Sequence, residues 1–160
     1  MLIRAATERD ANGIWSVIEP TLRAGETYAL PRDMTKDEAL AYWMGSDRST
    51  FVAVDDERIL GTYYLRPNQA GGGGHIANCG YITAYEAHGR GVARHMCEHS
   101  LDYARSRGFR GMQFNLVIST NEPAMHLWTS LGFEIVGRLP LAFRHPSFGY
   151  VDALVMFRAL

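Results

Sequence analysis

The feature that most constrains the fold is a change in the spacing of apolar residues along the chain. Before Ser49, apolar side chains recur at helical spacing in two segments, as in Ile14, Val17 and Ile18 of the first. From Ser49 the period changes to two, and an Asp55-Asp56-Glu57 turn separates two alternating segments, which predicts an antiparallel pair of strands. After Gly89, helix-like and strand-like segments alternate. A chain with this order of patterns is predicted to combine helices with a mixed sheet.

The segments expected from these patterns begin with a strand at 2–5, a helix with Thr7, Glu8 and Asp10 as its cap and first-turn acids that ends near Pro20, a loop at 21–31, and a helix from Asp33 or Thr35 to Gly45. Strands follow at 50–54, 59–65 and 75–83. The rest of the chain is expected to form a helix from Gly89 to about Arg107, a strand at 112–118, a helix at 121–131, a strand that opens at 133–136, and a strand at 150–157. The predicted fold class is α/β (α+β), with a mixed, mostly antiparallel sheet of six to seven strands and helices on both faces. No repeat or linker interrupts the pattern, so residues 1–160 are expected to form a single domain.

Composition excludes several classes of protein. With 47% hydrophobic residues, the chain can bury a core, which excludes a disordered or low-complexity protein. It has no apolar run of the length that a membrane helix needs and no apolar secretory region at its start, so we expect a soluble protein of the cytoplasm with no membrane partner. The two cysteines, Cys79 and Cys97, fit neither a disulfide framework nor a metal-binding spacing.

The charges are balanced, with a formal net charge of -1, but 15 of the 16 basic residues are arginine. Arginine binds phosphates and carboxylates through a planar fork of N–H groups. Because no basic stripe with interleaved aromatic residues is present, we expect no nucleic-acid partner. An anionic ligand would have to be bound by a local motif.

Such a motif stands where a predicted strand meets the long helix, in His88-Gly89-Arg90-Gly91-Val92-Ala93. Two glycines let the backbone turn tightly, and the free N–H groups at a helix N-terminus attract phosphate. The alternative is a glycine-rich turn with no ligand. The segment is not a dinucleotide fingerprint, since Arg94 stands where that pattern needs glycine, and it lacks the Gly-Lys-Ser/Thr of a P-loop.

The sequence resembles the GNAT superfamily of acetyl-CoA dependent N-acetyltransferases. The family's phosphate signature, Arg/Gln-x-x-Gly-x-Gly/Ala, is matched by Gly91 and Ala93, while His88 replaces its first residue. A second signature, Asn-x-x-Ala followed by an aromatic residue and Gly-Phe, is matched by Asn121, Ala124, Trp128 and Gly132-Phe133. The order of predicted elements agrees with the family over essentially the whole chain.

The resemblance implies that two strands splay apart, one ending at residues 81–83 and the other around Asn115, with the pantetheine arm of acetyl-CoA between them. It also implies which residues bind the co-substrate: Tyr81, Ile82, Thr83, His88, Gly89, Arg90, Gly91, Val92, Ala93, Arg94, Asn121 and Trp128. Backbone groups of residues 81–83 would polarise the thioester carbonyl, and those of residues 89–94 would bind the pyrophosphate.

Two departures from the family concern the proton transfers. Trp128 stands where the family usually has a tyrosine as general acid, and an indole N–H donates a hydrogen bond but supplies no proton at neutral pH. Leu116 stands where related protein-acetylating enzymes carry a glutamate. Catalysis is therefore expected to rest on orientation of the amine, with a thiolate as a fairly good leaving group.

Three asparagines are the candidates for that orientation. The stretches around Asn115 and His145 are similar to a subgroup that includes fungal acetyltransferases of azetidine-2-carboxylate, and phosphinothricin-type enzymes are a related comparison. In that subgroup, asparagines matching Asn78, Asn115 and Asn121 are implicated in catalysis. Asn78, Asn115 and Tyr28 are thus the expected substrate-binding residues, although hydrogen bonding within the sheet would also explain the first two.

The expected function is transfer of an acetyl group to the primary or secondary amine of a small molecule. Two alternatives remain: a protein or peptide N-acetyltransferase, and a non-catalytic acyl-CoA sensor.

The His95-Met96-Cys97-Glu98-His99 segment matches a zinc motif, but it lies on the helix that the phosphate loop already uses, so no metal is expected. His145 is expected in a loop, and the apolar residues near the C-terminus predict a homodimer.

Overall fold

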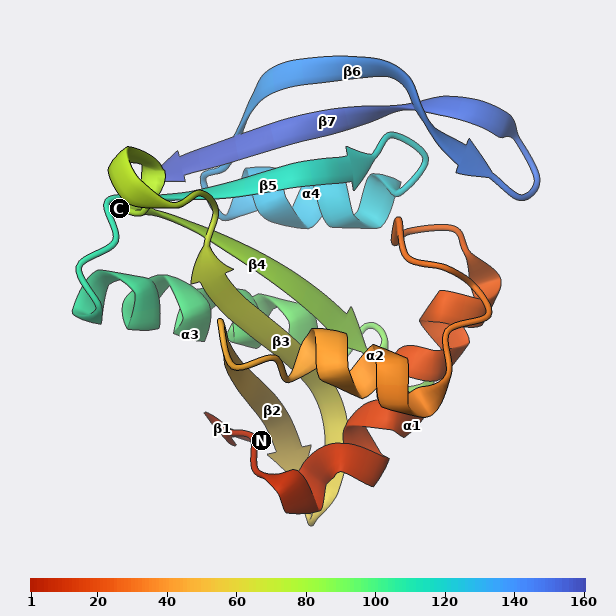
Figure 1. Cartoon of the computed structure of the whole chain (residues 1–160), viewed down its shortest axis with the longest axis vertical. Coiled ribbons are helices and arrows are strands. Elements are labelled where there is room, and N and C mark those ends of the chain that lie inside the picture. The colour runs from red at the N-terminus through yellow and green to blue at the C-terminus, as the bar shows by residue number, and fades with distance from the viewer.

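A computed structural model describes all 160 residues and shows one seven-stranded sheet (Figure 1). The strands are β1 (Leu2–Ala5), β2 (Ser49–Asp55), β3 (Arg58–Pro67), β4 (Ile76–Thr83), β5 (Gly111–Ile118), β6 (Glu134–His145) and β7 (Gly149–Ala159). They lie in the order β1-β2-β3-β4-β5-β7-β6. Only the β4–β5 pair is parallel, so the predicted mixed, mostly antiparallel sheet is confirmed.

Four helices cover both faces of the sheet, as predicted: α1 (Ala11–Ala24), α2 (Lys36–Trp43), α3 (Val92–Ser106) and α4 (Glu122–Ser130). Short 3-10 turns lie at Glu8–Asp10, Gly71–Gly73 and Tyr85–Ala87. Neighbouring residues of a strand point to opposite faces. Tyr63 of β3 contacts His99 of α3, whereas the next residue, Tyr64, contacts Trp43 of α2. The two faces of the sheet are therefore covered by different helix pairs, with α1 and α2 on the face of Tyr64.

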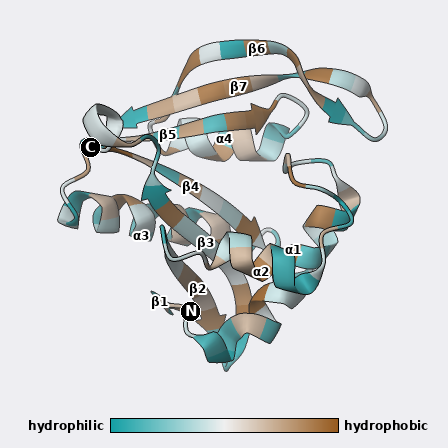
Figure 2. Cartoon of the chain, viewed as in Figure 1, coloured by the Kyte–Doolittle hydropathy of each residue, from teal (hydrophilic) through white to brown (hydrophobic).

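The core consists of one large cluster rich in aromatic residues and a small second cluster of Ile118, Phe143 and Ala153. Hydrophobic residues concentrate on the strands and on the helix faces that meet them (Figure 2). A chain of buried hydrogen bonds ties α2 to the sheet. Trp43 Nε1 donates to Thr62 Oγ1 at 3.0 Å, and Thr62 Oγ1 donates to the carbonyl of Phe51 at 2.8 Å. Because a buried polar group without a partner is costly, this relay fixes how α2 lies over β2 and β3.

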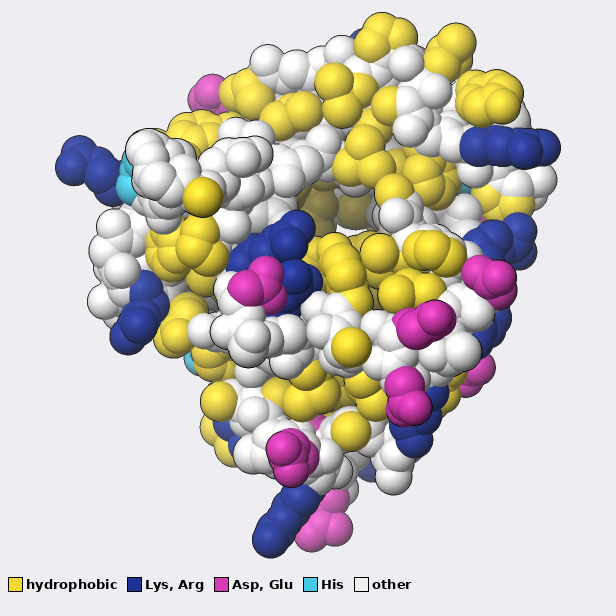
Figure 3. Space-filling model, viewed as in Figure 1, with side chains coloured by type: hydrophobic (Ala, Val, Ile, Leu, Met, Phe, Trp, Pro, Cys, Tyr) yellow, Lys and Arg dark blue, Asp and Glu magenta, His cyan; other side chains and the backbone are white.

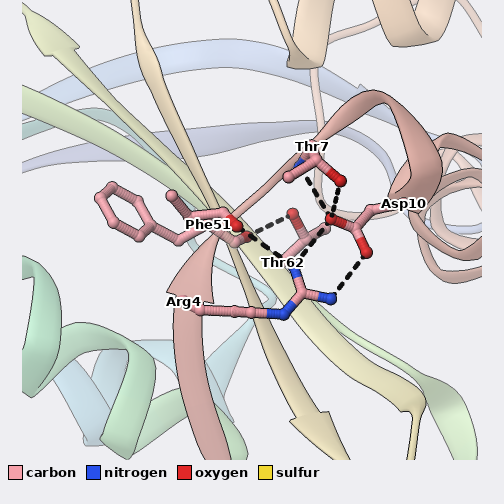
Figure 4. Close-up of polar contacts among 6 residues, drawn as sticks. Arg4, Thr7, Asp10, Phe51 and Thr62 are labelled. Atoms are coloured by element: carbon pink, nitrogen blue, oxygen red, sulfur yellow. Dashed lines mark hydrogen bonds and ion pairs between the residues drawn. The ribbon is translucent and has the colours of Figure 1, made fainter.

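A second polar cluster fixes the start of α1 (Figure 4). The guanidinium of Arg4 forms two hydrogen bonds of 2.8 Å with the carboxylate of Asp10, which also accepts from the backbone N–H of Thr7. The hydrogen bonds from Arg4 lower the pKa of the buried Asp10 most, and those from Thr7 lower it further, to about 2. This cluster joins β1 to the first turn of α1.

The parallel strands β4 and β5 separate almost at once. They pair only at Ile76 with Gly111 and at Ala77 with Met112, near their N-terminal ends. Beyond that point the two strands no longer pair, which is the splay that the family resemblance implies. The split leaves the facing edges of both strands free to bind something else.

The predicted end of the first helix is wrong. We expected a loop from Thr21, but α1 continues past Pro20 to Ala24 and ends at Gly25, whose φ is +65°. Leu22 is buried with Ile14 on the same helix face. Burial of this apolar stripe outweighs the hydrogen bond that proline cannot donate.

The strand predicted to open at 133–136 is present as β6, which runs for 12 residues, from Glu134 to His145. Nearly all of β6 is exposed at the sheet edge, so it shows no alternation, and an edge position tolerates Pro140. His145 is not a loop residue: it ends β6, is buried, and accepts hydrogen bonds at Nδ1 from the N–H groups of Ser147 and Phe148.

None of the four helices has both the length and the apolar character needed to cross a bilayer.

Candidate active site

A cavity of about 830 Å³ opens between the splayed strands. It is bounded by β4, β5, the start of α3, the first turns of α4 and the loop that follows α1. Figure 3 shows the hollow near the centre of one face of the molecule, with hydrophobic side chains around it and basic side chains at its border. The cavity is elongated along β4, since it is lined by residues from Asn78 to Thr83 and by the glycine loop beyond.

Nearly all of the predicted site residues meet at this cavity. Those that line it are Tyr28, Asn78, Tyr81, Ile82, Thr83, His88, Gly89, Gly91, Val92, Ala93, Arg94, Asn115, Asn121 and Trp128. Arg90 is the exception: its guanidinium donates to Asp55 at 3.1 Å and it does not line the cavity. The Arg90 side chain therefore pairs outside the cavity, and the expected role of its backbone in binding the pyrophosphate stays a prediction.

The glycine loop at one end of the cavity has unused hydrogen-bond donors. Gly89 and Gly91 have φ values of +77° and +78°, which only glycine adopts easily. The backbone N–H groups of Gly89, Gly91, Val92, Ala93 and Arg94 make no hydrogen bond within the protein. His88 stabilises the approach to the loop through a 3.3 Å contact between its Nε2 and the carbonyl of Thr83. Five free donors and a helix N-terminus form a cradle for an anion.

The floor of the cavity beyond the loop is aromatic. The Trp128 ring lies 5.1 Å from Tyr81 and 5.0 Å from Phe114, measured between ring centroids. The Tyr81 hydroxyl forms a 2.7 Å hydrogen bond with Ser100. Burial raises the pKa of Tyr81 well above its usual value, so this phenol stays neutral at physiological pH.

Tyr28 connects the loop after α1 to β4. Its hydroxyl donates to the backbone carbonyl of Tyr81 at 2.9 Å, and its ring packs against Trp43. Burial also raises the pKa of Tyr28 far above neutrality, so it acts as a hydrogen-bond donor and not as a base. The contact holds the loop over the middle of the cavity.

The three asparagines occupy different environments. Asn78 is buried, and its Nδ2 donates to the carbonyl of Gln113 at 2.9 Å, which bridges β4 and β5 just beyond their last pair. Asn121 caps α4, because its Oδ1 accepts from the N–H of Ala124 at 3.4 Å. Since Oδ1 is used in the cap, the Nδ2 group of Asn121 remains to donate a hydrogen bond into the cavity.

Asn115, unlike Asn78, has an exposed side chain. The register of β5 against β7 shifts between Phe114 and Val117, and this bulge takes Asn115 out of the core. Its Nδ2 donates to Asn68 at 2.7 Å, and its Oδ1 accepts from Gln113. Asn115 thus belongs to a polar network at the mouth of the cavity.

Several cavity residues were missed by sequence reasoning, namely Leu30, Tyr42, Tyr64 and Arg66. Tyr64 and Arg66 are two residues apart on β3, so their side chains lie on the same face of the sheet. That period of two is the one sequence pattern that could have identified them.

The helix carrying the zinc-like motif was predicted to hold no metal. His95 Nδ1 contacts the carbonyl of Gly91, and His99 Nδ1 contacts the Tyr63 hydroxyl. No group of three or more metal-ligating side chains gathers anywhere in the chain.

The arrangement suits an elongated ligand with an anionic head group. The anion would bind at the glycine loop, and a polar chain would pair with the open edges of β4 and β5. The space on the α1–α2 face of β4, between Tyr28 and Arg66, would remain for a second molecule.

Comparisons with known proteins agree with this geometry. The model of the acetyltransferase (GNAT) family matches residues 11–133. The solved structure of a GCN5-related N-acetyltransferase from Kribbella flavida is similar to this chain, with 42% identity and a TM-score of 0.95 over 99% of this chain and 97% of that one.

More distant relatives extend the comparison. The N-acetyltransferase aca1 of Schizosaccharomyces pombe is 29% identical over 151 residues, which cover 84% of this chain and 72% of the relative. A phosphinothricin acetyltransferase from Sinorhizobium meliloti, solved in complex with acetyl-CoA, is 19% identical with a TM-score of 0.86, covering 99% of this chain and 88% of that one. At that identity the likeness shows the fold alone.

Proposed function

The chain belongs to the acetyltransferase (GNAT) family and is an acetyl-CoA dependent N-acetyltransferase, and we propose that its acceptor is the primary or secondary amine of a small molecule. Amino acids, amino-acid analogues and toxic amines are the acceptors we have in mind. Residues 1–160 would act as one acetyltransferase domain. The observation that carries the proposal is the loop after α1, which Tyr28 anchors over β4.

The residues present fit acetyl-CoA. Five unpaired N–H groups from Gly89 to Arg94 match a pyrophosphate, which accepts several hydrogen bonds at once. The split between β4 and β5 leaves backbone donors and acceptors unused, and these would pair with the amides of the pantetheine arm. Asn121 Nδ2 and the Trp128 ring would flank the same arm. Bound acetyl-CoA would supply the activated acetyl group.

Residues 81–83 would position the thioester carbonyl. Because Tyr28 already donates to the Tyr81 carbonyl, that peptide is held in one orientation. A fixed N–H in this segment would stabilise negative charge on the carbonyl oxygen during attack, without a cost of reorganisation. Tyr28 would therefore act as a positioning residue as well as a wall of the acceptor space.

The reaction would proceed by direct attack of a neutral amine. The new C–N bond forms as the C–S bond breaks, and the coenzyme leaves as a thiolate. The nitrogen loses one proton to solvent, and the thiolate takes one proton from solvent to become the thiol. Asn78 and Asn115 would orient the amine by hydrogen bonds, and proximity would supply most of the rate enhancement. Tyr28, Tyr64 and Tyr81 all have a pKa raised by burial, so none of them serves as a base at neutral pH.

The walls of the acceptor space favour a small molecule over a peptide. Tyr28, Leu30 and Tyr42 come from the loop after α1 and from α2, and they cover the face of β4 where an acceptor would lie. A peptide needs an open groove to bind a chain on both sides of its reacting residue.

Release of free thiol from acetyl-CoA tests the function. The protein would be assayed with amino acids, proline analogues, phosphinothricin, polyamines and short peptides, and with Asn115→Ala as the loss-of-orientation variant. We expect turnover with one class of small amine and a large decrease in the variant. Turnover with peptides alone would replace the proposal by a protein acetyltransferase, and coenzyme binding without turnover of any amine would favour a sensor.

We also propose that the protein is a homodimer formed through β6. This strand ends the sheet and exposes a row of apolar side chains, in which Ile135 is 56%, Val136 57% and Leu141 63% exposed. An exposed apolar edge strand is a template for pairing with another strand. Light scattering after size exclusion should give twice the 17.9 kDa mass of one chain, and a monomer at all concentrations would refute the dimer.

A further inference from the structure

Two guanidinium groups near the acceptor space share a single carboxylate. Arg48 Nε lies 2.8 Å from Asp47 Oδ1, and Arg66 Nη1 lies 3.9 Å from Asp47 Oδ2. The Arg48 side chain is only 6% exposed, whereas Asp47 is 60% exposed. Two positive charges against one negative charge leave an excess of positive charge at this point of the cavity wall.

Each of these arginines also has a hydrogen-bond donor without a partner. Arg48 Nη1 and Arg66 Nε are buried, and neither is hydrogen-bonded within the protein. They are the only buried side-chain nitrogen or oxygen atoms in the chain for which this is true. Because an unpaired buried donor on a charged group is costly, the site is incomplete without an acceptor.

The position of Arg66 faces the acceptor space. Arg66 lies directly opposite Asn78, and Tyr64 directly opposite Gly80, in the antiparallel pairing of β3 with β4. Side chains that oppose each other in this way point to the same face. All four residues line the cavity, on the face that α1 and α2 cover.

Tyr64 holds the two guanidiniums in place. The Arg48 and Arg66 guanidinium carbons lie 4.8 Å and 5.9 Å from the centroid of its ring. The ring itself has little freedom, since a Cβ atom on Gly80 would come within 2.7 Å of it. Stacking on an aromatic ring orients a guanidinium and leaves its N–H edge available.

From this geometry we propose that Arg66 binds a carboxylate of the acceptor, so that the substrates are amino carboxylates and not simple amines. The inference rests on the proposed function and specifies its substrate class. A carboxylate presents two oxygens in a plane, which matches the fork of a guanidinium. Asn78 lies beside Arg66, and its Nδ2 donates to the carbonyl of Gln113. Its Oδ1 would accept a hydrogen bond from the amine of the bound amino carboxylate. Arg48 is a positioning residue, because it does not line the cavity.

The anion at Arg66 is distinct from the coenzyme phosphates. The glycine loop follows Thr83, five residues beyond Asn78 along β4, which is about 17 Å in an extended strand. A variant of Arg66 should therefore leave coenzyme affinity unchanged. Loss of coenzyme affinity would instead assign this anion site to acetyl-CoA and overturn the proposal.

The test compares each amino acid with its own amide as acceptor, in the wild type and in Arg66→Gln. The amide has lost the negative charge of the carboxylate but keeps the amine. Because the amine of the amide is less basic, a larger fraction of it is in the reactive neutral form. This difference favours the amide, so a preference for the amino acid would be seen in spite of it. We expect the wild type to prefer the amino acid, and Arg66→Gln to lower kcat/KM for it by about 10- to 100-fold, mainly through KM. Activity with the amide should change little.

Two further variants make the result specific. Arg105→Gln removes an exposed arginine that pairs with Asp102 on α3, outside the cavity, and should leave all parameters unchanged. Arg66→Lys keeps the charge without the fork and should recover part of the lost affinity, which also serves if Arg66→Gln fails to fold. Equal turnover of amino acids and amides by the wild type would overturn the carboxylate site and leave the acetyltransferase function intact. If coenzyme binds but no amine reacts, both proposals fail.

Discussion

Replacement of Gly91 by alanine is a direct test of the anion cradle at the start of α3. Gly91 has a φ of +78°, in the left-handed region that costs an alanine about 1 to 2 kcal/mol. Space is not the obstacle, since the nearest atom to a new Cβ would be His95 Nδ1 at 3.6 Å. The variant can relieve the strain only by turning the loop, and this would redirect the free N–H groups of residues 91 and 92.

Gly108, just past the C-terminus of the same helix, is a matched control. Its φ is +84°, a Cβ there would have no neighbour within 4 Å, and it lies outside the cavity. Both substitutions should therefore lower Tm by a similar amount, roughly 2 to 8 °C for a chain of this size. Only Gly91→Ala should weaken coenzyme binding. Loss of one hydrogen bond to a charged phosphate predicts a Kd raised by about 10- to 100-fold.

Calorimetric titration with acetyl-CoA and thermal unfolding of both variants would provide these numbers. The two readouts separate a local effect on the loop from general destabilisation, because the control carries the same backbone strain. If Gly91→Ala bound acetyl-CoA as tightly as the wild type while losing stability like Gly108→Ala, the pyrophosphate would not lie on this loop. The assignment of the cavity's anionic end would then be wrong.

Three further predictions concern the framework of the site. Asp10→Asn should lower the free energy of unfolding by about 2 kcal/mol at pH 7, because the native pKa of about 2 lies below the ordinary 3.8. That contribution is complete above pH 4 and disappears as the pH falls through 2, so urea unfolding should show the two proteins converging in acid. Gly80→Ala should raise KM for the acceptor and leave the coenzyme Kd unchanged, because its Cβ displaces Tyr64; an unchanged KM would contradict the acceptor wall. Trp43→Phe should cost about 1 to 3 kcal/mol, measured by denaturant unfolding, since it removes the buried hydrogen bond to Thr62.

The spacing of apolar residues was sufficient to predict most of the fold. It failed where the extent of a helix or strand depends on its place in the tertiary structure. The hairpin of β2 and β3 and the long helix α3 follow from apolar spacing and from turn and stop residues. Pro20 led to a wrong end of the first helix, because the burial of Leu22 in the core is a tertiary effect that a rule based on proline alone ignores. The length of β6 could not be predicted, since an exposed edge strand has no buried face to impose a period of two.

The candidate site divides in the same way. The glycine loop is a contiguous motif, so its residues could be identified from the sequence, although Arg90 turns away to Asp55. The cluster of Tyr64, Arg66 and Asn78 depends on the register between β3 and β4, which no local pattern encodes. Exposure of Asn115 depends on a bulge in β5, and that too appears only when the strands are paired.

The split between β4 and β5 is the feature of the sheet that would let one cavity bind two molecules, as we propose. A parallel pair that continued beyond Ala77 would satisfy its backbone groups internally and leave no space between the strands. Separation leaves those groups unpaired in a partly apolar cavity, an arrangement that is costly unless a ligand or water pairs with them. In the proposed complex, a coenzyme at the start of α3 and an acceptor on the α1–α2 side of β4 would meet in this gap at Tyr81. The hydrogen bonds that β4 and β5 do not form would then lie where the two proposed substrates come into contact.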